Sequence, residues 1–449
     1  MTATPDDASL LAELLKSAAA AGAESADAIL VRSSALSHAQ RLGKVERLER
    51  EESDDLGLRI LLGQRQAIVS TTDFSPDALS ALVDRALAMA RVVPEDPYCG
   101  LADPQLLTSA RPELDIFDPE EPSAETLIER ARSCEEAARA VAGVTNSEGA
   151  EAGWSSSRVT LAASNGFAGS YAVTRHSLGV SVLAGEGLEM ERDYDFSSTV
   201  HGSDLESAEE VGRRAGERAV KRLNPRKPRT GRVPLVFDPR VANGMLRHFA
   251  GAINGAAIAR GTSFLKERLG ESVFAKGVQI VDDPHRPRGP RSRPFDAEGL
   301  ATSRQALVED GRLTTWLLDL ASARQLNLAP TGHASRGVSG TPGPATSNLY
   351  FAPGTTSSQE MIAAIDEGFY VTEMIGMGVN GVTGDYSRGA SGYWIEKGEL
   401  THPVSEATIA GNLKEMFKEL TPASDLTFEY GTDSPTLRID GMTVAGAGE

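Results

Sequence analysis

Apolar residues recur every three or four positions in parts of the N-terminal half, and this period predicts amphipathic helices. The first helix begins at Thr4 and ends at Gly22, the second begins at Ser75, and the third begins at Ser123. A serine or threonine is typical of a helix start, because its hydroxyl accepts a hydrogen bond from a free backbone amide. A further helix is expected over residues 204–223.

Segments between these helices are rich in alternating apolar and β-branched residues, which predicts antiparallel strands. The strongest turn signal is Asn165-Gly166, which should join strands at 158–164 and 167–175 in a hairpin. The other strands predicted in this half are residues 26–34, 37–42, 56–62, 66–71, 178–183 and 188–194. Helices and antiparallel strands in such groups are typical of an α+β fold.

Residues 224–231 are rich in proline and basic side chains and show no periodicity, which is typical of a linker between domains. A mostly apolar helix is expected over residues 241–258. Short strands follow at 232–237, 278–282, 306–309, 313–317, 348–351, 369–373, 390–395 and 399–404. Many short strands joined by tight turns suggest a barrel or a closed sandwich. We therefore predict an N-terminal α/β domain at 1–223, with an antiparallel or mixed sheet, and a C-terminal β-barrel-like domain at 232–449.

Composition narrows the range of partners. The chain has 449 residues and 63 acidic against 45 basic side chains, for a formal charge of −18. This surplus argues against a nucleic acid or an anionic membrane as the main partner, since both repel an anionic protein. Two cysteines, Cys99 and Cys134, are too few for a disulfide scaffold, and no apolar run is long enough to span a bilayer. The cytoplasm is the expected location.

One glycine-rich stretch stands out near the C-terminus. Residues 376–399 place glycines around Asn380, Thr383 and Asp385, and the stretch then enters an alternating run at 390–395. Glycines permit close backbone approach and tight bends, so the stretch suits either a barrel corner with bulges or a loop that carries function. The pattern itself leaves both interpretations open.

Three strings of the sequence are distinctive together: NGVTGDYSRGASGYWIEKGEL at 380–400, ARGTSFL at 259–265 and TSNLYFAPG at 346–354. With these strings the chain resembles the TldD/TldE (PmbA) family of metallopeptidases. The similarity extends over nearly the whole chain, and the first string is more similar to the TldE/PmbA side of the family than to the TldD side. The resemblance implies the same layout of an N-terminal α/β domain and a C-terminal barrel-like domain.

The resemblance also shows what this chain lacks. TldD-type members carry a His-Glu-x-x-x-His motif on the helix before the string that matches ARGTS, where two imidazoles hold Zn²⁺ and the glutamate accepts a proton from the bound water. Here His248 occupies the first position, Phe249 stands in place of the glutamate and Ile253 in place of the second histidine. None of the seven histidines is followed by glutamate, and both cysteines lie in the first half, away from the C-terminal cysteine ligand of the TldD type. A lone histidine beside an apolar residue is more often a packing residue than a ligand.

The resemblance to TldE/PmbA implies a non-catalytic subunit without a cofactor of its own. Its expected partner is a TldD-like catalytic subunit that carries the zinc, and the expected substrates are small or unfolded peptides. When the partner is absent, the chain is expected to pair with itself as a homodimer. Two alternatives stay open: a stand-alone peptidase with an unidentified site, and a regulatory protein of the kind the family's older name, modulator of DNA gyrase, describes.

A peptidase of broad specificity should hold its substrate by main-chain hydrogen bonds, as an added strand. The glycine-rich stretch is the candidate surface, and its candidate substrate-binding residues are Asn380, Gly381, Thr383, Gly384 and Asp385. The alternative is that their polar side chains satisfy only the turns of the loop itself. No catalytic or metal-binding residue is predicted in this chain.

Overall fold

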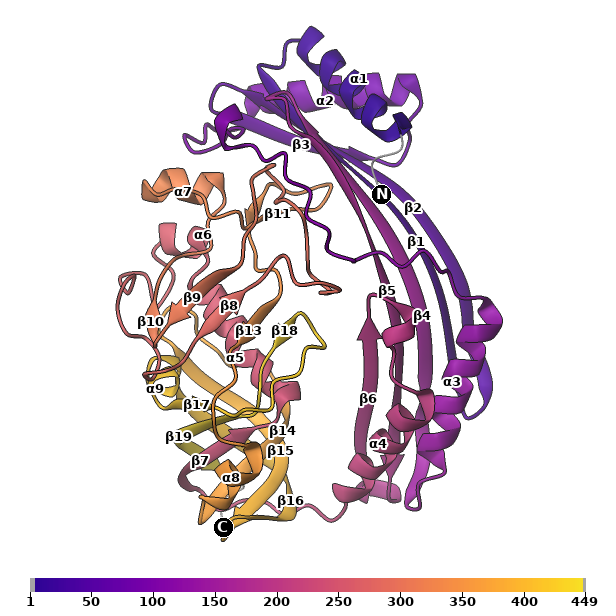
Figure 1. Cartoon of the computed structure of the whole chain (residues 1–449), viewed down its shortest axis with the longest axis vertical. Helices are drawn as coiled ribbons and strands as arrows, with labels where there is room; N and C mark the ends of the chain where they lie inside the picture. The colour runs from indigo at the N-terminus through magenta and orange to yellow at the C-terminus, as the bar shows by residue number, and fades with distance from the viewer. Residues whose placement is uncertain (1–4, 447–449) are drawn as a thin grey trace.

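The computed structural model describes residues 5–446, so Thr4, the predicted cap of the first helix, lies outside it. A long curved sheet forms the N-terminal half, and the C-terminal half lies against its inner side (Figure 1). Within the described residues this sheet has six strands in the order β3-β2-β1-β4-β5-β6, and all neighbours are antiparallel. The strands are β1 (Ser25–Arg41), β2 (Lys44–Leu62), β3 (Arg65–Thr71), β4 (Val144–Ala163), β5 (Ala168–Ala184) and β6 (Glu191–Thr199).

Four helices cover the other side of this sheet in two pairs (Figure 1). They are α1 (Pro5–Ala20), α2 (Pro76–Val92), α3 (Ala124–Arg139) and α4 (Ala208–Lys221), and short 3₁₀ turns lie at η1 (Pro104–Leu106), η2 (Gly187–Glu189) and η3 (Gly202–Asp204). The predicted start of α3 is confirmed, because the Ser123 hydroxyl accepts a hydrogen bond from the Thr126 amide. Cys134 is buried between α3 and the sheet, and this burial raises the pKa of its thiol to about 12. A structural role follows for this thiol.

The strands of the sheet are longer than the sequence predicts. The two segments predicted at 26–34 and 37–42 form one continuous strand, β1, and 178–183 belongs to β5 rather than to a separate strand. Small polar residues in the middle of the sheet lack the apolar pattern of a strand, so the sequence does not predict that the strands are continuous there. They pair nonetheless: Ser33 lies opposite Ser157, and their hydroxyl oxygens are 2.9 Å apart.

The outer half of β2 forms an exposed edge. Residues 44–55 pair with β1, and no second strand among residues 5–446 pairs with them, because β3 reaches only as far as Leu56. Their side chains are largely charged and exposed. Arg50 donates to Glu52 and to Glu121, at 3.0 and 2.5 Å, on this surface.

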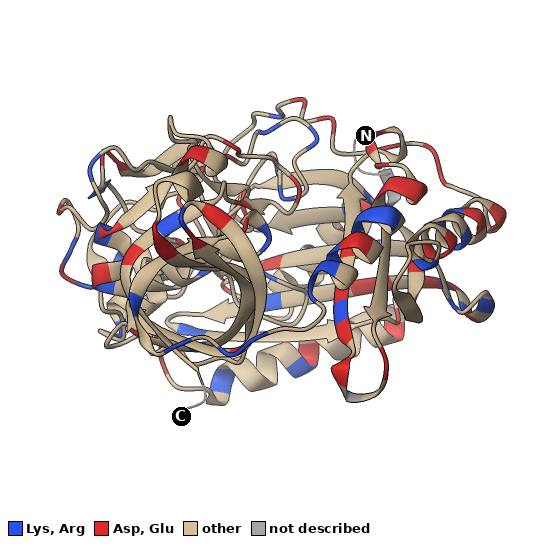
Figure 2. Cartoon of the chain, turned by 90° about the horizontal axis from the view of Figure 1, so that it is seen from below, with Lys and Arg blue, Asp and Glu red and all other residues tan. Residues whose placement is uncertain are grey.

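The C-terminal half contains a closed barrel, which Figure 2 shows as a ring. In the described part of the chain five strands close it, in the order β16-β15-β14-β7-β19, and β19 pairs back with β16. They are β7 (Gly231–Phe237), β14 (Glu367–Ile375), β15 (Asp385–Glu396), β16 (Glu399–Asn412) and β19 (Leu437–Ala445), with β17 (Leu420–Pro422) added beside β19. The predicted α+β fold with a C-terminal β-barrel-like part is confirmed.

A smaller mixed sheet lies beside the barrel and is ordered β10-β9-β8-β13-β18 in the described residues. Its strands are β8 (Ile280–Asp282), β9 (Gln305–Glu309), β10 (Arg312–Leu313), β13 (Leu349–Phe351) and β18 (Thr432–Asp433); β11 (Ala334–Ser335) and β12 (Gly343–Pro344) pair separately. The helices of this half are α5 (Pro239–Ala252), α6 (Gly255–Ala259), α7 (Leu320–Leu326), α8 (Ser358–Ala363) and α9 (Leu413–Lys418). No helix in residues 5–446 is both long and apolar enough to cross a membrane.

The helix predicted over residues 241–258 is two helices, and the prediction of one continuous helix is wrong. α5 ends at Ala252 and α6 begins at Gly255. Asn254 lies between them, and its side-chain oxygen accepts from the Ala256 amide at 3.1 Å while its side-chain nitrogen donates to the Pro344 carbonyl at 2.9 Å. Asparagine at such a position starts a new helix by capping its free amides.

The two halves meet through an apolar patch and a buried ion-pair cluster. The Phe295 ring of the C-terminal half packs edge-on against Phe167 of the sheet, with centroids 5.1 Å apart. Beside this patch Asp27 of β1 accepts hydrogen bonds from Arg59 of β2 and from Arg336 of the C-terminal half. All three side chains are at most 4% exposed. The position of the barrel on the sheet is therefore fixed by specific contacts as well as by apolar burial.

Candidate functional site

A cavity of about 500 Å³ lies along β4, β5 and β6, at the end of the sheet that is remote from α1 and α2. Tyr194 and Phe196 line it. The Phe196 ring lies 5.3 Å from the ring of Tyr430, and the Arg240 guanidinium lies 5.8 Å from the centre of the Tyr194 ring. Both partners belong to the C-terminal half, so this cavity opens at the boundary between the two halves. Such boundaries are common places for ligand sites.

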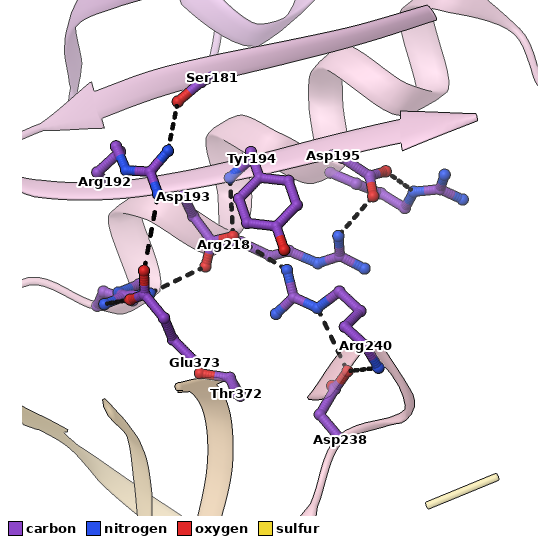
Figure 3. A network of polar contacts seen from close by, with 12 residues as sticks. Ser181, Arg192, Asp193, Tyr194, Asp195, Arg218, Asp238, Arg240, Thr372 and Glu373 are labelled. Atoms are coloured by element: carbon purple, nitrogen blue, oxygen red, sulfur yellow. Dashed lines mark hydrogen bonds and ion pairs between the residues drawn. The ribbon is translucent and has the colours of Figure 1, made fainter. Parts of the chain in front are cut away.

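Ion pairs fix the geometry of this boundary (Figure 3). Asp193 of β6 lies 3.0 Å from Arg240 of α5 and 3.6 Å from Arg222. Arg222 also lies 2.5 Å from Glu373 of β14, which lies 3.6 Å from Arg192. Alternating charges thus run from the N-terminal sheet to the barrel. Most of these groups are buried or half-buried, so solvent screens them less than it screens surface pairs.

Helix α5 begins at this boundary because of Asp238. The Asp238 carboxylate accepts from the Arg240 amide at 3.0 Å, which caps the helix, and from the Tyr370 hydroxyl at 2.9 Å. Pro239 follows in the first turn, where its missing amide proton leaves no hydrogen bond unmade. The cap therefore places the N-terminus of α5 against β6, and the rest of the helix packs on the barrel.

The residues of α5 at the positions of the zinc motif point into different environments. Phe249 and Ile253 are fully buried in the core of the C-terminal half, where the Phe249 ring lies 5.2 Å from that of Phe274. His248 lies on another side of the helix, with its ring 5.8 Å from that of Tyr386 on β15. Burial, together with the positive charges of Arg388 and Arg247, lowers the pKa of His248 to about 4. The imidazole is therefore neutral near pH 7.

These residues do not fit a zinc ion. His248 supplies one imidazole, whereas zinc sites in proteins use three or four protein ligands. The nearby Arg247 and Arg388 guanidiniums would repel a dication. No group of three or more His, Cys, Asp or Glu side chains suited to a metal is found in the described residues.

The glycine-rich stretch is a tight turn followed by a strand. Strand β15 begins at Asp385, five residues before the predicted run at 390–395, so the loop between β14 and β15 covers residues 376–384 alone. The Asn380 side chain accepts from the Val382 amide at 2.9 Å, and the Thr383 hydroxyl donates to Asp385 at 2.6 Å. Asp385 also accepts from the side chain of Asn412 at 3.0 Å. The candidate polar side chains thus make hydrogen bonds within the turn and to β16.

The strand that follows this turn is already paired along both edges. β15 forms antiparallel ladders with β14 and with β16. An extended peptide therefore has no free edge of β15 to join, and the glycine-rich stretch can offer it only the turn at 376–384. Substrate binding by Asn380, Gly381, Thr383, Gly384 and Asp385 stays a prediction.

The two candidate glycines allow a matched test. A side chain at Gly381 would meet no atom within 4 Å, whereas Gly384 has a φ of +87° and its Cβ would lie 2.9 Å from the Asn412 side chain. We expect Gly384→Val to destabilise the fold by more than about 1 kcal/mol, because the backbone conformation disfavours it. Gly381→Val should leave the melting temperature unchanged. If a folded Gly381→Val variant still binds peptide, this turn has a structural role and does not contact the peptide.

Two arginines that the sequence did not single out, Arg247 of α5 and Arg388 of β15, carry positive charges that act on His248. Burial lowers the pKa of the Arg247 guanidinium, and the charges of Arg291, in the loop after β8, and Arg388 lower it further. These residues are far apart in the sequence, and Arg388 alone lies in one of the family strings, at 380–400. The available signals were this string and the position of Arg247 and His248 on the helix that carries chemistry in TldD-type members.

Comparison with known proteins accounts for nearly the whole chain. Three family profiles match in order: the PmbA/TldA metallopeptidase domain 1 at residues 26–90, the central domain at 117–223 and the C-terminal domain at 230–446. Metalloprotease PmbA of Escherichia coli O157:H7 is 38% identical over 425 residues, which cover 94% of this chain and 92% of that protein. The Metalloprotease PmbA homolog of Haemophilus influenzae is 35% identical over the same shares of the two chains.

Solved structures of other proteins share this fold. A protein from Bacteroides thetaiotaomicron superposes with a TM-score of 0.91 at 27% identity, covering 99% of each chain. TldE from Thermococcus kodakarensis has the same fold, with a TM-score of 0.87 at 20% identity over 97% of this chain and all of that one. The full-length match to PmbA sequences and the three consecutive domain matches show that this chain belongs to the TldD/TldE (PmbA) family of metallopeptidases.

Proposed function

We propose that this chain is a non-catalytic, TldE/PmbA-like subunit of a heteromeric zinc metallopeptidase that degrades or processes small or unfolded peptides. The observation that carries the proposal is the make-up of α5. In a family described as metallopeptidases, the positions of the motif glutamate and second histidine hold Phe249 and Ile253, which are core residues. A TldD-like partner would supply the zinc, the zinc-bound water and the general base.

The boundary between the sheet and the barrel supports a role in holding a peptide. The cavity along β4, β5 and β6 measures about 500 Å³, and its lining includes glycine, serine, aromatic and several acidic residues. Such a surface suits an extended peptide bound largely through its main chain. We place this chain in the cytoplasm and propose that it pairs with itself when the catalytic partner is absent. The net charge of −18 disfavours nucleic acid as a ligand.

The proposal predicts that peptidase activity appears only when the two chains are together. The chain should be purified alone, co-expressed with a TldD-like protein, and assayed with an unstructured peptide. We expect no stoichiometric zinc in the isolated chain by elemental analysis, no cleavage by it, and cleavage by the heteromer that a chelator abolishes. The matched control is a heteromer in which the partner's motif glutamate is replaced by glutamine, and it should be inactive.

Three results would reject the proposal. One zinc per isolated chain after dialysis would point to a metal site on the chain itself. Cleavage by the isolated chain that survives chelation would favour the stand-alone peptidase. A chain that binds a different protein and never activates a TldD-like partner would favour a regulatory role.

A further inference from the structure

Strand β5 keeps a free edge over its first half. β6 pairs with β5 only from His176 onward, so residues 168–175 of β5 have β4 on one side and no strand among residues 5–446 on the other (Figure 1). Of the described residues, only those of the connector between α2 and α3 (residues 93–123) form hydrogen bonds with the main chain of this edge. Most of the edge is therefore unpaired.

The connector touches this edge at two points. The Thr174 amide donates to the Ile116 carbonyl at 3.1 Å, and the Arg111 guanidinium donates to the Ala168 carbonyl at 2.9 Å. Both main-chain groups on β5 therefore point away from β4. Because a strand in an antiparallel sheet directs the amide and the carbonyl of every second residue to the same edge, the second and the fourth residue after Ala168 share this direction.

These two residues, Ser170 and Ala172, thus present two amides and two carbonyls at the edge. None of the four groups has a hydrogen-bond partner in the part of the chain that the structure describes. Both residues line a cavity of about 940 Å³. Unpaired main-chain groups at the edge of a sheet are a template on which another chain can add a strand. The four groups therefore suit an extended main chain rather than a particular side chain.

The 940 Å³ cavity follows this edge as a groove with mostly apolar walls. Ala8, Ala12 and Leu15 of α1 line one side, and Pro294 and residues 111–117 of the connector line the other. Its charged lining residues all belong to the connector. An extended strand rises about 3.3 Å per residue, so the edge between the two connector contacts spans about 20 Å, the length of about six residues. The groove shares no lining residue with the 500 Å³ cavity along β4, β5 and β6.

The other free edge of the same sheet is different. Residues 44–55 of β2 are largely charged and exposed, and charged side chains protect an edge from pairing with another chain. Residues 168–172 of β5 read Ala-Gly-Ser-Tyr-Ala and carry no charge. The sheet thus protects one free edge by charge, whereas the other is uncharged and lies in an apolar groove.

We propose that the free edge of β5 binds an uncharged, extended segment of a peptide as an added strand. The four unpaired groups of Ser170 and Ala172 would form hydrogen bonds with the peptide main chain, and alternate side chains of the peptide would point toward α1 and toward the connector. Walls on both sides leave room for a single strand, which a flexible peptide offers more readily than a folded protein does. That the peptide is a substrate of the peptidase rests on the proposed function.

The test measures binding by the full chain in isolation. A short fluorescent peptide with valine at alternate positions and lysine at each end is compared with the same peptide N-methylated at consecutive central residues. Methylation keeps the side chains but removes the main-chain donors. Loss of two main-chain hydrogen bonds should weaken binding about ten- to hundredfold. Equal affinity of the two peptides, or binding of neither, would overturn the proposal.

Variants of the groove locate the site. Ala12 is exposed and lines the cavity, so Ala12→Trp should obstruct it and remove the preference for the unmethylated peptide. Ala20→Trp, at an exposed position of α1 outside the lining, is the matched control and should keep the preference. Ser170→Pro removes an outward amide without breaking a hydrogen bond to β4, so it should lower the affinity about five- to tenfold. Melting temperatures check folding. Folded Ala12→Trp and Ser170→Pro variants that bind like the wild type would contradict the assignment.

Other modes of binding give separate outcomes. If Tyr194→Ala weakens peptide binding and Ala12→Trp does not, the peptide lies in the 500 Å³ cavity and the proposal fails. If Ala12→Trp leaves peptide binding unchanged but prevents self-association or assembly with a TldD-like protein, the groove is a subunit contact and the proposal also fails. Because binding is measured on the isolated chain, a heteromer without peptidase activity would reject the proposed function but not the peptide-binding edge.

Discussion

Replacing Asp27 with asparagine is expected to lower the free energy of unfolding by about 3–5 kcal/mol, because the change leaves buried guanidiniums without a counter-charge. Asp27 lies between Arg59 of its own sheet and Arg336 of the C-terminal half, and the three side chains are at most 4% exposed. Urea unfolding at pH 7 measures the loss. The matched control is Asp54→Asn, which removes an aspartate from a partly exposed pair with Arg32 on the same sheet and should change stability by about 0–1 kcal/mol.

The effect of Asp27 depends on pH in a definite direction. Burial alone would raise the pKa of the Asp27 carboxyl, but the Arg59 and Arg336 guanidiniums outweigh it and hold this pKa below its usual range. The stabilisation is therefore complete above the unfolded-state pKa of about 3.9 and is lost as the pH falls through the lower folded-state value. The difference between wild type and Asp27→Asn should shrink on strong acidification. A difference at pH 7 no larger than that of Asp54→Asn would mean that the cluster does not join the two halves.

Restoring the zinc motif by Phe249→Glu with Ile253→His is expected to unfold the C-terminal half rather than to create a metal site. Phe249 is fully buried against Phe274 and Phe417, and loss of a buried phenylalanine alone destabilises a protein by about 3–5 kcal/mol. A carboxylate in its place adds the free energy of burying a charge. The sum is comparable with the whole stability of a typical domain, about 5–15 kcal/mol.

The measurement is thermal unfolding combined with elemental analysis. The double variant should be insoluble or lack a cooperative transition, and it should hold no stoichiometric zinc. Phe249→Leu keeps an apolar side chain in the core and is the matched control, which should fold. A double variant that melts like the wild type and binds one zinc per chain would show that the α5 site was lost by two substitutions alone, with no change in the surrounding core.

Local signals in the sequence predicted local structure well. Asn165-Gly166 forms the predicted hairpin turn, with Gly166 at a φ of +98°, and Ser123 caps α3. The prediction of one helix at 241–258 failed at Asn254. Its side-chain oxygen caps a new helix at the Ala256 amide, and its side-chain nitrogen donates to the carbonyl of Pro344, a contact distant in sequence. The full length of β1 was missed for a related reason: Ser33 and its neighbours are held by strands on both sides rather than by their own propensity.

The candidate site shows the same difference between what local sequence predicts and what depends on distant contacts. The family motifs correctly assigned the family, whereas the assignment of Phe249 and Ile253 as replacements of a base and a ligand stays a prediction from the resemblance. The sequence could not show that β15 is paired on both edges, since barrel closure depends on the pairing of β16 with β19. Nor could it show that the charges of Arg291 and Arg388 act on Arg247, because each of the three residues comes from a different element.

The charged outer half of β2 has a consequence for how the molecule behaves in a crowded solution. An unpaired strand edge is a template on which another chain can add its own strand, and long exposed edges of this kind nucleate aggregates. A strand added along residues 44–55 would have to place its side chains beside a row of charges, including Arg50 and its glutamate partners. Few sequences carry charges that match this row. The charged outer half of β2 therefore keeps the sheet of one molecule from pairing with the sheet of the next.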